Sequence, residues 1–178
     1  RTRRSRSLRS ARLTALTLAA LIFVLDQASK LYVLYILELE FRGPLTINPY
    51  IDLILVWNRG ISYGLFQQHA DWGRYGLVLL SVGAAIGLTI WLFRTPVKTI
   101  MFGTSLLIGG ALGNALDRIL YGAVVDFVLL HWQEWQWYVF NVADAAIVAG
   151  VLLLLYDSLL GESKRMHAAG NLHTTDRT

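Results

Sequence analysis

The sequence contains no cysteine and few charged residues. Without cysteine, the chain cannot form a disulfide framework, a thiolate metal site or a cysteine nucleophile. Charged residues make up 16 % of the 178 residues, whereas apolar residues make up 55 % and the mean hydropathy is positive. This composition is too apolar for a water-soluble domain of this length. The chain is therefore predicted to be an integral membrane protein.

Four apolar runs are long enough to cross about 30 Å of hydrocarbon. They cover roughly residues 13–37, 75–93, 99–116 and 138–160. We predict a mainly α membrane protein in which residues 13–160 form a single four-transmembrane-helix bundle. A basic N-terminal tail, residues 1–12, precedes the bundle, and a C-terminal tail, residues 161–178, is expected to be disordered. The first run is longer than a signal-peptide core and lacks a small-residue cleavage site, so we expect a retained helix.

Basic residues are concentrated on one side of these runs. Eleven lysines and arginines precede the first run, flank the turn at 94–98 or follow the fourth run, whereas four lie in segments 38–74 and 117–137. The positive-inside rule therefore predicts that both termini are cytoplasmic and that segments 38–74 and 117–137 face outward. These outward segments hold or adjoin tryptophans suited to the headgroup region: Trp57, Trp72, Trp132, Trp135 and Trp137.

Segment 38–74 is predicted to form a small extracytoplasmic β-sheet and a short interfacial helix. Apolar side chains alternate at 51, 53, 55 and 57, and Asn48-Pro49 marks a turn before them. The helix is expected over Gln67–Arg74. We expect the whole insert to act as a cover that closes over a substrate and limits the access of water.

Glycines in two of the runs are spaced for close helix packing. Gly109 and Gly113 in the third run, and Gly83 and Gly87 in the second, have the small-xxx-small spacing that lets helices approach closely in lipid. The prediction is a tight bundle that holds polar groups in fixed positions at its outer end.

Asp126 and Asp144 lie at the mouths of apolar segments. A charge near the hydrocarbon costs roughly 2.5–3.5 kcal/mol, so such residues usually face an interior cavity and perform chemistry or transport. Two close aspartates share a proton, so one can activate water while the other protonates a leaving group. Asp26 and Lys30, four residues apart, can pair on one helix face. That pair either stabilises the fold or borders the site.

Other functions are compatible with some of these residues. Acidic residues in membrane spans also serve as proton relays in transporters, although inverted repeats and broken helices are not evident here. A non-catalytic scaffold is a third possibility. His131 could suggest a metal or triad site, but its tryptophan-rich surroundings favour an interfacial position. No HExxH zinc motif is present, and the predicted chemistry needs neither metal nor cofactor.

Five sequence blocks together resemble those of bacterial lipoprotein signal peptidase, also called signal peptidase II. They are residues 26–30 (Asp-Gln-Ala-Ser-Lys), 58–64 (Asn-Arg-Gly-Ile-Ser-Tyr-Gly), 109–118 (Gly-Gly-Ala-Leu-Gly-Asn-Ala-Leu-Asp-Arg), 124–127 (Val-Val-Asp-Phe) and 140–144 (Phe-Asn-Val-Ala-Asp). Their order and spacing match over roughly residues 13–160. The second block departs mildly from the family at Ile61, Ser62 and Tyr63, which concerns substrate contacts rather than chemistry.

The resemblance implies an aspartic endopeptidase of the bacterial inner membrane, with its active site toward the periplasmic face. Such an enzyme cleaves diacylglyceryl-modified prolipoproteins N-terminal to the lipidated cysteine, using Asp126 and Asp144 as the catalytic dyad. The resemblance assigns the lining or support of the pocket to a further set: Asp26, Lys30, Asn58, Gly60, Asn114, Arg118 and Asn141. The expected partners are these substrates, membrane lipid and cyclic-peptide inhibitors such as globomycin. A monomer without a nucleic-acid partner is expected.

Overall fold

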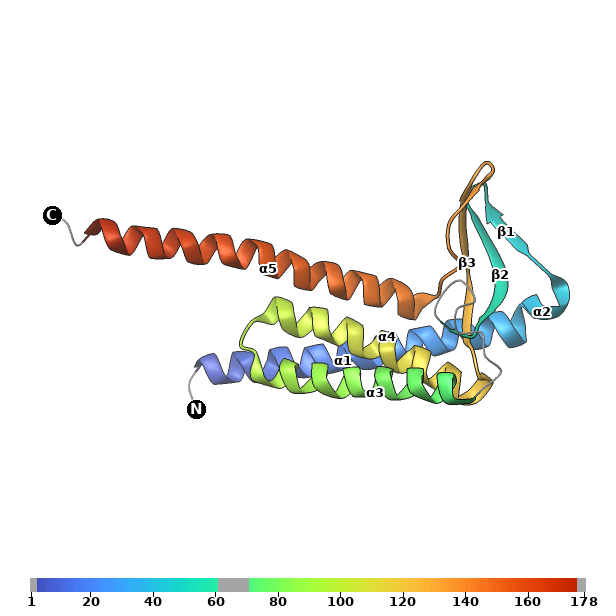
Figure 1. Ribbon diagram of the computed structural model, residues 1–178, viewed down its shortest axis with the longest axis horizontal. Coiled ribbons are helices and arrows are strands. Elements are labelled where there is room, and N and C mark those ends of the chain that lie inside the picture. The colour runs from blue at the N-terminus through green and yellow to red at the C-terminus, as the bar shows by residue number, and fades with distance from the viewer. Residues whose placement is uncertain (1–2, 61–70, 176–178) are drawn as a thin grey trace.

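Four long helices form the body of the molecule (Figure 1). The computed structural model describes residues 3–60 and 71–175. The long helices are α1 (Arg3–Leu31), α3 (Asp71–Arg94), α4 (Lys98–Tyr121) and α5 (Val142–Thr175). Stretches apolar and long enough to cross a membrane cover Ser7–Ile36, Trp72–Arg94, Lys98–Tyr121 and Val142–Leu160. The predicted four-span helical fold is confirmed.

The ends of two helices differ from the predicted boundaries. Helix α1 already begins at Arg3, so most of the predicted basic tail is helical. Helix α5 continues to Thr175, through most of the range where disorder was expected. Residues 161–175 contain no proline and several good helix formers, so nothing in the sequence stops the helix after the span. The fourth span begins at Val142 rather than at 138, because Phe140 still pairs with Val128 of the sheet.

Helix α4 lies at the centre of the bundle, in contact with α1, α3 and α5. Its apolar window is 56 % buried, against 17 % for each of the other three. Glycines make the contacts close. A Cβ at Gly109 would lie 2.6 Å from the carbonyl oxygen of Ala19 in α1, and one at Gly110 would lie 2.6 Å from that of Ala143 in α5. A Cβ at Gly113 would meet the Asp26 carboxylate. The packing predicted for Gly109 and Gly113 is confirmed.

The same prediction is wrong for Gly83 and Gly87 of α3. A Cβ at either position would have no heavy atom of the described structure within 4 Å. Helix α3 instead packs through another face, on which Ala85 and Leu92 are buried with Met101 and Ile108 of α4. Spacing alone identifies a stripe of small residues, but it does not say whether that stripe faces a helix.

A four-stranded antiparallel sheet lies across one end of the bundle (Figure 1). The strands follow the order β1 (Leu45–Asn48), β2 (Ile51–Asn58), β3 (Val124–Trp132) and β4 (Trp135–Gln136). The predicted sheet and its extended run at 51–57 are confirmed. Strand β3 was not predicted, and it comes from the second outward segment. The α3–α4 turn, the start of α1 and the end of α5 lie at the opposite end of the molecule (Figure 1).

A π-helical turn (Tyr32–Ile36) and the short helix α2 (Leu39–Arg42) connect α1 to the sheet. Leu39 is buried together with Val33, Val125 and Phe127. These four residues form an apolar cluster beneath the sheet. Residues 67–70 of the predicted interfacial helix at Gln67–Arg74 lie outside the described residues, and residues 71–74 belong to α3. The predicted cover, which includes 61–70, is likewise only partly described.

Candidate active site

Asp126 lies on β3, at the junction between the sheet and the bundle. Its neighbours Val125 and Phe127 belong to the apolar cluster beneath the sheet, so strand alternation directs Asp126 to the opposite face. The chain reaches this position because Gly122 ends α4 in the left-handed conformation, with φ 77°. The side chain of Asp126 is buried, and both of its oxygens accept hydrogen bonds. Asn58 Nδ2 donates to Oδ2 at 3.0 Å, and Asn141 Nδ2 donates to Oδ1 at 2.7 Å.

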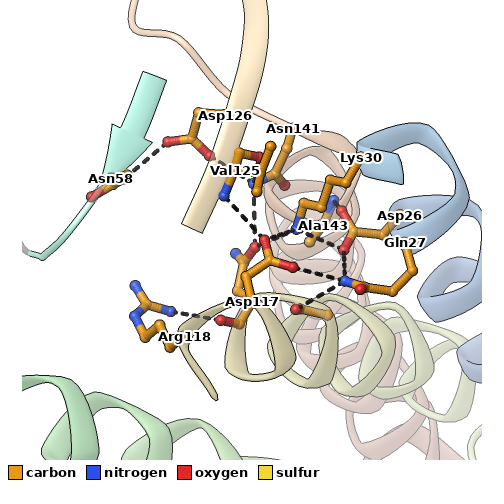
Figure 2. Close-up of polar contacts among 12 residues, drawn as sticks. Asp26, Gln27, Lys30, Asn58, Asp117, Arg118, Val125, Asp126, Asn141 and Ala143 are labelled. Atoms are coloured by element: carbon orange, nitrogen blue, oxygen red, sulfur yellow. Dashed lines mark hydrogen bonds and ion pairs between the residues drawn. The ribbon is translucent and has the colours of Figure 1, made fainter. Parts of the chain in front are cut away.

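Asn141 and Asp144 form a reciprocal cap at the start of α5. The Asn141 side-chain oxygen accepts the Asp144 N–H at 2.9 Å, and the Asp144 carboxylate accepts the Asn141 N–H at 3.3 Å. This is the hydrogen-bond pattern of a capping box, with residues three apart satisfying two helix N–H groups. The cap explains the spacing of the 140–144 block. It leaves the Asn141 amide nitrogen to donate to Asp126 (Figure 2), and also to Asn114 Oδ1 and the Val125 carbonyl oxygen.

Asn114 of α4 bonds to Asp144 and to Asn141, so it joins the same network. Its amide nitrogen donates to Asp144 Oδ1 at 2.8 Å, and its oxygen accepts a hydrogen bond from Asn141 Nδ2 at 3.2 Å. Asn141 therefore contacts both aspartates directly, and Asn114 contacts Asp144 and Asn141. Amides suit this place because each offers donors and an acceptor without adding charge.

Burial raises the pKa of Asp126 to about 6. The hydrogen bond from Asn58 lowers the pKa, the negative charge of Asp144 raises it, and the hydrogen bond from Asn141 and the charge of Lys30 lower it. Asn141 is bonded to both carboxylates, which brings Asp126 and Asp144 into one network. A carboxyl group with a pKa this close to neutrality can hold a proton and release it during a reaction.

Asp26, Lys30 and Asp117 form a buried ion-pair network in the same region (Figure 2). Lys30 Nζ is 2.7 Å from Asp26 Oδ2 and 2.7 Å from Asp117 Oδ2, and it donates to Asn114 Oδ1 at 3.1 Å. Asp26 Oδ1 accepts the N–H of Ala143 at 2.9 Å. The predicted pairing of Asp26 with Lys30 is therefore confirmed. The pair also reaches α4 and the start of α5, so it supports the fold and borders the site.

Three residues of this region were absent from the predicted site. Asp117 accepts the N–H of Val125, the residue before Asp126, at 3.1 Å. Gln27 donates to Asp117 at 2.9 Å and to Asp26 at 3.1 Å (Figure 2). Tyr138 accepts a hydrogen bond from Asn58 Nδ2 at 2.8 Å. Asp117 and Gln27 lie beside predicted residues within two of the five sequence blocks, so their positions in those blocks could have identified them. Tyr138 lies outside every block.

The remaining predicted residues join the same network. The Gly60 N–H donates to Asn58 Oδ1 at 3.2 Å, and Arg118 Nη1 donates to the carbonyl oxygen of Asn114 at 3.2 Å. A continuous chain of hydrogen bonds thus links all nine predicted residues: Asp26, Lys30, Asn58, Gly60, Asn114, Arg118, Asp126, Asn141 and Asp144. His131 lies apart from it, on β3, with its Nε2 3.3 Å from Asp52 Oδ2 of β2.

The family profile described as signal peptidase (SPase) II matches residues 18–160. The chain belongs to the signal peptidase II family. A lipoprotein signal peptidase from Methylobacterium radiotolerans is 51 % identical over 149 residues, covering 84 % of this chain and 87 % of that protein. One from Methylorubrum extorquens is 54 % identical over 135 residues, covering 76 % and 79 %.

Solved structures agree on the fold. A bacterial membrane enzyme determined in meso at 2.3 Å resolution matches with a TM-score of 0.74 at 23 % identity, covering 85 % of this chain and 90 % of that one. A second, at 1.9 Å resolution, matches with a TM-score of 0.69 at 24 % identity. Membership of the signal peptidase II family makes the chain a protease, and its four apolar helices make it a multi-pass bacterial membrane protein.

Proposed function

We propose that this chain is an aspartic endopeptidase that removes signal peptides from diacylglyceryl-modified prolipoproteins. The cleaved bond is the one N-terminal to the lipidated cysteine. The observation that carries the proposal is the direct contact of Asn141 with both Asp126 and Asp144, inside a buried network at one end of a membrane bundle. The names of the relatives, lipoprotein signal peptidases, support the substrate class.

The mechanism follows from two carboxylates that hold one proton between them. The ionised carboxylate takes a proton from a water molecule as the water oxygen attacks the scissile carbonyl carbon. The neutral carboxyl gives its proton to the leaving amine as the carbon–nitrogen bond breaks, which returns the pair to a singly protonated state. Asn58 and Asn141 hold the Asp126 carboxylate in a fixed orientation during both steps.

The membrane explains why a substrate reaches this site. The acyl chains of a lipidated cysteine remain in one leaflet, and the signal helix lies in the bilayer. The bond between them is therefore presented near the membrane surface, at the level of the end of the bundle that carries the sheet. Helices α1, α3 and α5 expose apolar side chains there, such as Leu31, Tyr75 and Val148, which can contact acyl chains and the signal helix.

The charge bias supports an orientation in which this end lies on the periplasmic side. Basic residues cluster at both chain termini and at the 94–98 turn, which lie at the other end of the bundle (Figure 1). Both termini are then in the cytoplasm, and the active site faces the periplasm. The same site would also bind cyclic-peptide inhibitors such as globomycin, because a peptide backbone offers the carbonyl and N–H groups that the site amides can pair with. One chain supplies every residue of the network, which supports action as a monomer.

Incubation of the purified protein with a diacylglyceryl-modified prolipoprotein tests this function. Mass spectrometry of the products should find a free signal peptide and a mature protein that begins at the lipidated cysteine. The same prolipoprotein without diacylglycerol should be cleaved much more slowly, and the Asp126→Asn/Asp144→Asn double variant should cleave neither. A wild-type protein that releases no signal peptide while it conducts protons in liposomes would favour a transporter instead.

A further inference from the structure

We propose that Tyr138 is a positioning residue of the active site, where its hydroxyl group fixes the Asn58 amide against Asp126. The inference rests on the proposed function and adds a residue that belongs to none of the five blocks. Tyr138 lies on the segment between β4 and α5. Asn58 lies at the end of β2, 80 residues earlier in the chain.

Three hydrogen bonds define the orientation of the Asn58 side chain. Its two amide hydrogens are divided between Asp126 Oδ2, at 3.0 Å, and the Tyr138 hydroxyl oxygen, at 2.8 Å. Its oxygen accepts the Gly60 N–H at 3.2 Å. Without Tyr138, two of the three bonds would remain, one from the amide nitrogen to Asp126 and one from the Gly60 N–H to the amide oxygen. The hydroxyl therefore restricts rotation of the amide and keeps one hydrogen directed at the carboxylate.

Backbone hydrogen bonds on either side of Tyr138 hold its segment against the sheet. The Trp137 N–H donates to the Leu130 carbonyl oxygen at 2.8 Å, and the Phe140 N–H donates to that of Val128 at 3.0 Å. These two bonds attach the segment around Tyr138 to β3, the strand that carries Asp126. Tyr138 is 54 % exposed, whereas Asp126 is buried. Tyr138 thus connects the exposed side of the site to the buried Asp126 carboxylate through the side-chain amide of Asn58.

This arrangement affects protonation of the dyad. The other charged groups that influence Asp126 are Asp144, Lys30 and the guanidinium of Arg118. The hydrogen bond from Asn58 favours the ionised form of Asp126 and lowers its pKa. Loss of the Tyr138 hydroxyl loosens this bond, so the pKa of Asp126 should rise. If a singly protonated pair is the active form, the limb on which activity falls with increasing pH moves to higher pH.

The variant Tyr138→Phe tests the proposal, because it removes the hydroxyl and keeps the ring. We expect kcat to fall about three- to tenfold, the size expected for one neutral hydrogen bond, with KM nearly unchanged. The alkaline limb of the pH–rate profile should move upward. The matched control is Tyr50→Phe on the same sheet, a tyrosine that is 58 % exposed and whose ring packs edge-on against Trp132. That control should retain wild-type kcat and the wild-type pH profile.

A double-variant cycle shows whether Tyr138 acts through Asn58. In an Asn58→Ala background, Tyr138→Phe should cause no further loss and no further shift of the pH profile. Equal losses in both backgrounds, or wild-type kinetics in Tyr138→Phe, would overturn the inference while the wild type still cleaves. A wild-type enzyme that does not cleave the lipidated prolipoprotein would instead refute the proposed function.

Discussion

At the scale of single residues, the site is built by amides that hold carboxylates. Asp126 and Asp144 both bind Asn141, and Asn114 contacts Asp144 and Asn141. An amide supplies hydrogen-bond donors to a carboxylate without bringing a full positive charge, which would lower the pKa of the carboxyl group further. The cationic Lys30 is paired with Asp26 and Asp117 instead. Lys30 thus neutralises the buried charges of Asp26 and Asp117, while the amides of Asn114 and Asn141 position Asp144 and Asp126.

Asn141 combines two duties that a pair of variants can separate. Asn141→Ala removes both the helix cap and the hydrogen bond to Asp126, so it should destabilise the protein by about 1–2 kcal/mol and lower kcat. Asn141→Ser keeps a good cap and adds no charge, but it has no amide group to donate to Asp126. It should retain more of the stability than Asn141→Ala, while kcat falls by about tenfold or more. Thermal unfolding in detergent and kcat, measured on both variants, check this. Wild-type turnover in Asn141→Ser would show that the Asn141–Asp126 bond is not needed.

Much of the residue-level site could be predicted, because its residues lie in short blocks with fixed spacing. The capping box explains one spacing, since at a helix start two side chains three residues apart can each accept the backbone N–H of the other residue. Asp26 and Lys30 are likewise one helical turn apart. Tyr138 was missed for the opposite reason. Its partner Asn58 is distant in sequence, and no local spacing relates the two.

At the scale of secondary-structure elements, the position of α4 decides the architecture. Its glycines let α1 and α5 approach closely enough for residues of three helices to share one network. Strand β3 then brings Asp126 to that network from the sheet. The sequence did not predict β3, because 124–132 is an apolar run whose pairing with β2 joins segments about 70 residues apart. The packing predicted for Gly83 and Gly87 of α3 was also wrong, since glycine spacing carries no information about what a helix faces.

Two glycine substitutions of the same kind should have opposite effects. Gly109→Ala places a methyl group against the backbone of α1, so it should destabilise the protein by about 1–3 kcal/mol and reduce activity. Gly83→Ala meets open space and should be neutral or stabilising by up to about 1 kcal/mol, because alanine favours the helix. Thermal unfolding of the two variants in one detergent makes the comparison. Equal destabilisation by both would show that α3 packs through its glycine stripe.

At the scale of the whole molecule, the network lies at the end of the bundle next to the sheet, and the basic termini lie at the other end (Figure 1). This polarity agrees with a peptidase that receives its substrate from the membrane and cleaves near one surface. The four apolar runs predicted the number of spans, because a segment that crosses lipid must be long and apolar. The distribution of basic residues predicts which side of the membrane each end occupies.

The absence of cysteine makes that orientation simple to test. Glu134→Cys lies in the exposed β3–β4 turn, and Pro96→Cys lies in the exposed α3–α4 turn. In intact spheroplasts, a membrane-impermeant maleimide should label Glu134→Cys, whereas Pro96→Cys should react only after permeabilisation. The reverse pattern would place the active site in the cytoplasm.

The central claim is that Asp126 and Asp144 act together, and the most direct test is the turnover of each single asparagine variant on a diacylglyceryl-modified prolipoprotein. Residues 60–64 also spell the G-x-S-x-G pattern of serine hydrolases, so Ser62→Ala belongs in the same assay. Asp126→Asn and Asp144→Asn should each remain folded and lose more than about 100-fold in kcat, while Asp52→Asn and Ser62→Ala retain turnover. Wild-type cleavage by either Asp126→Asn or Asp144→Asn would contradict the account.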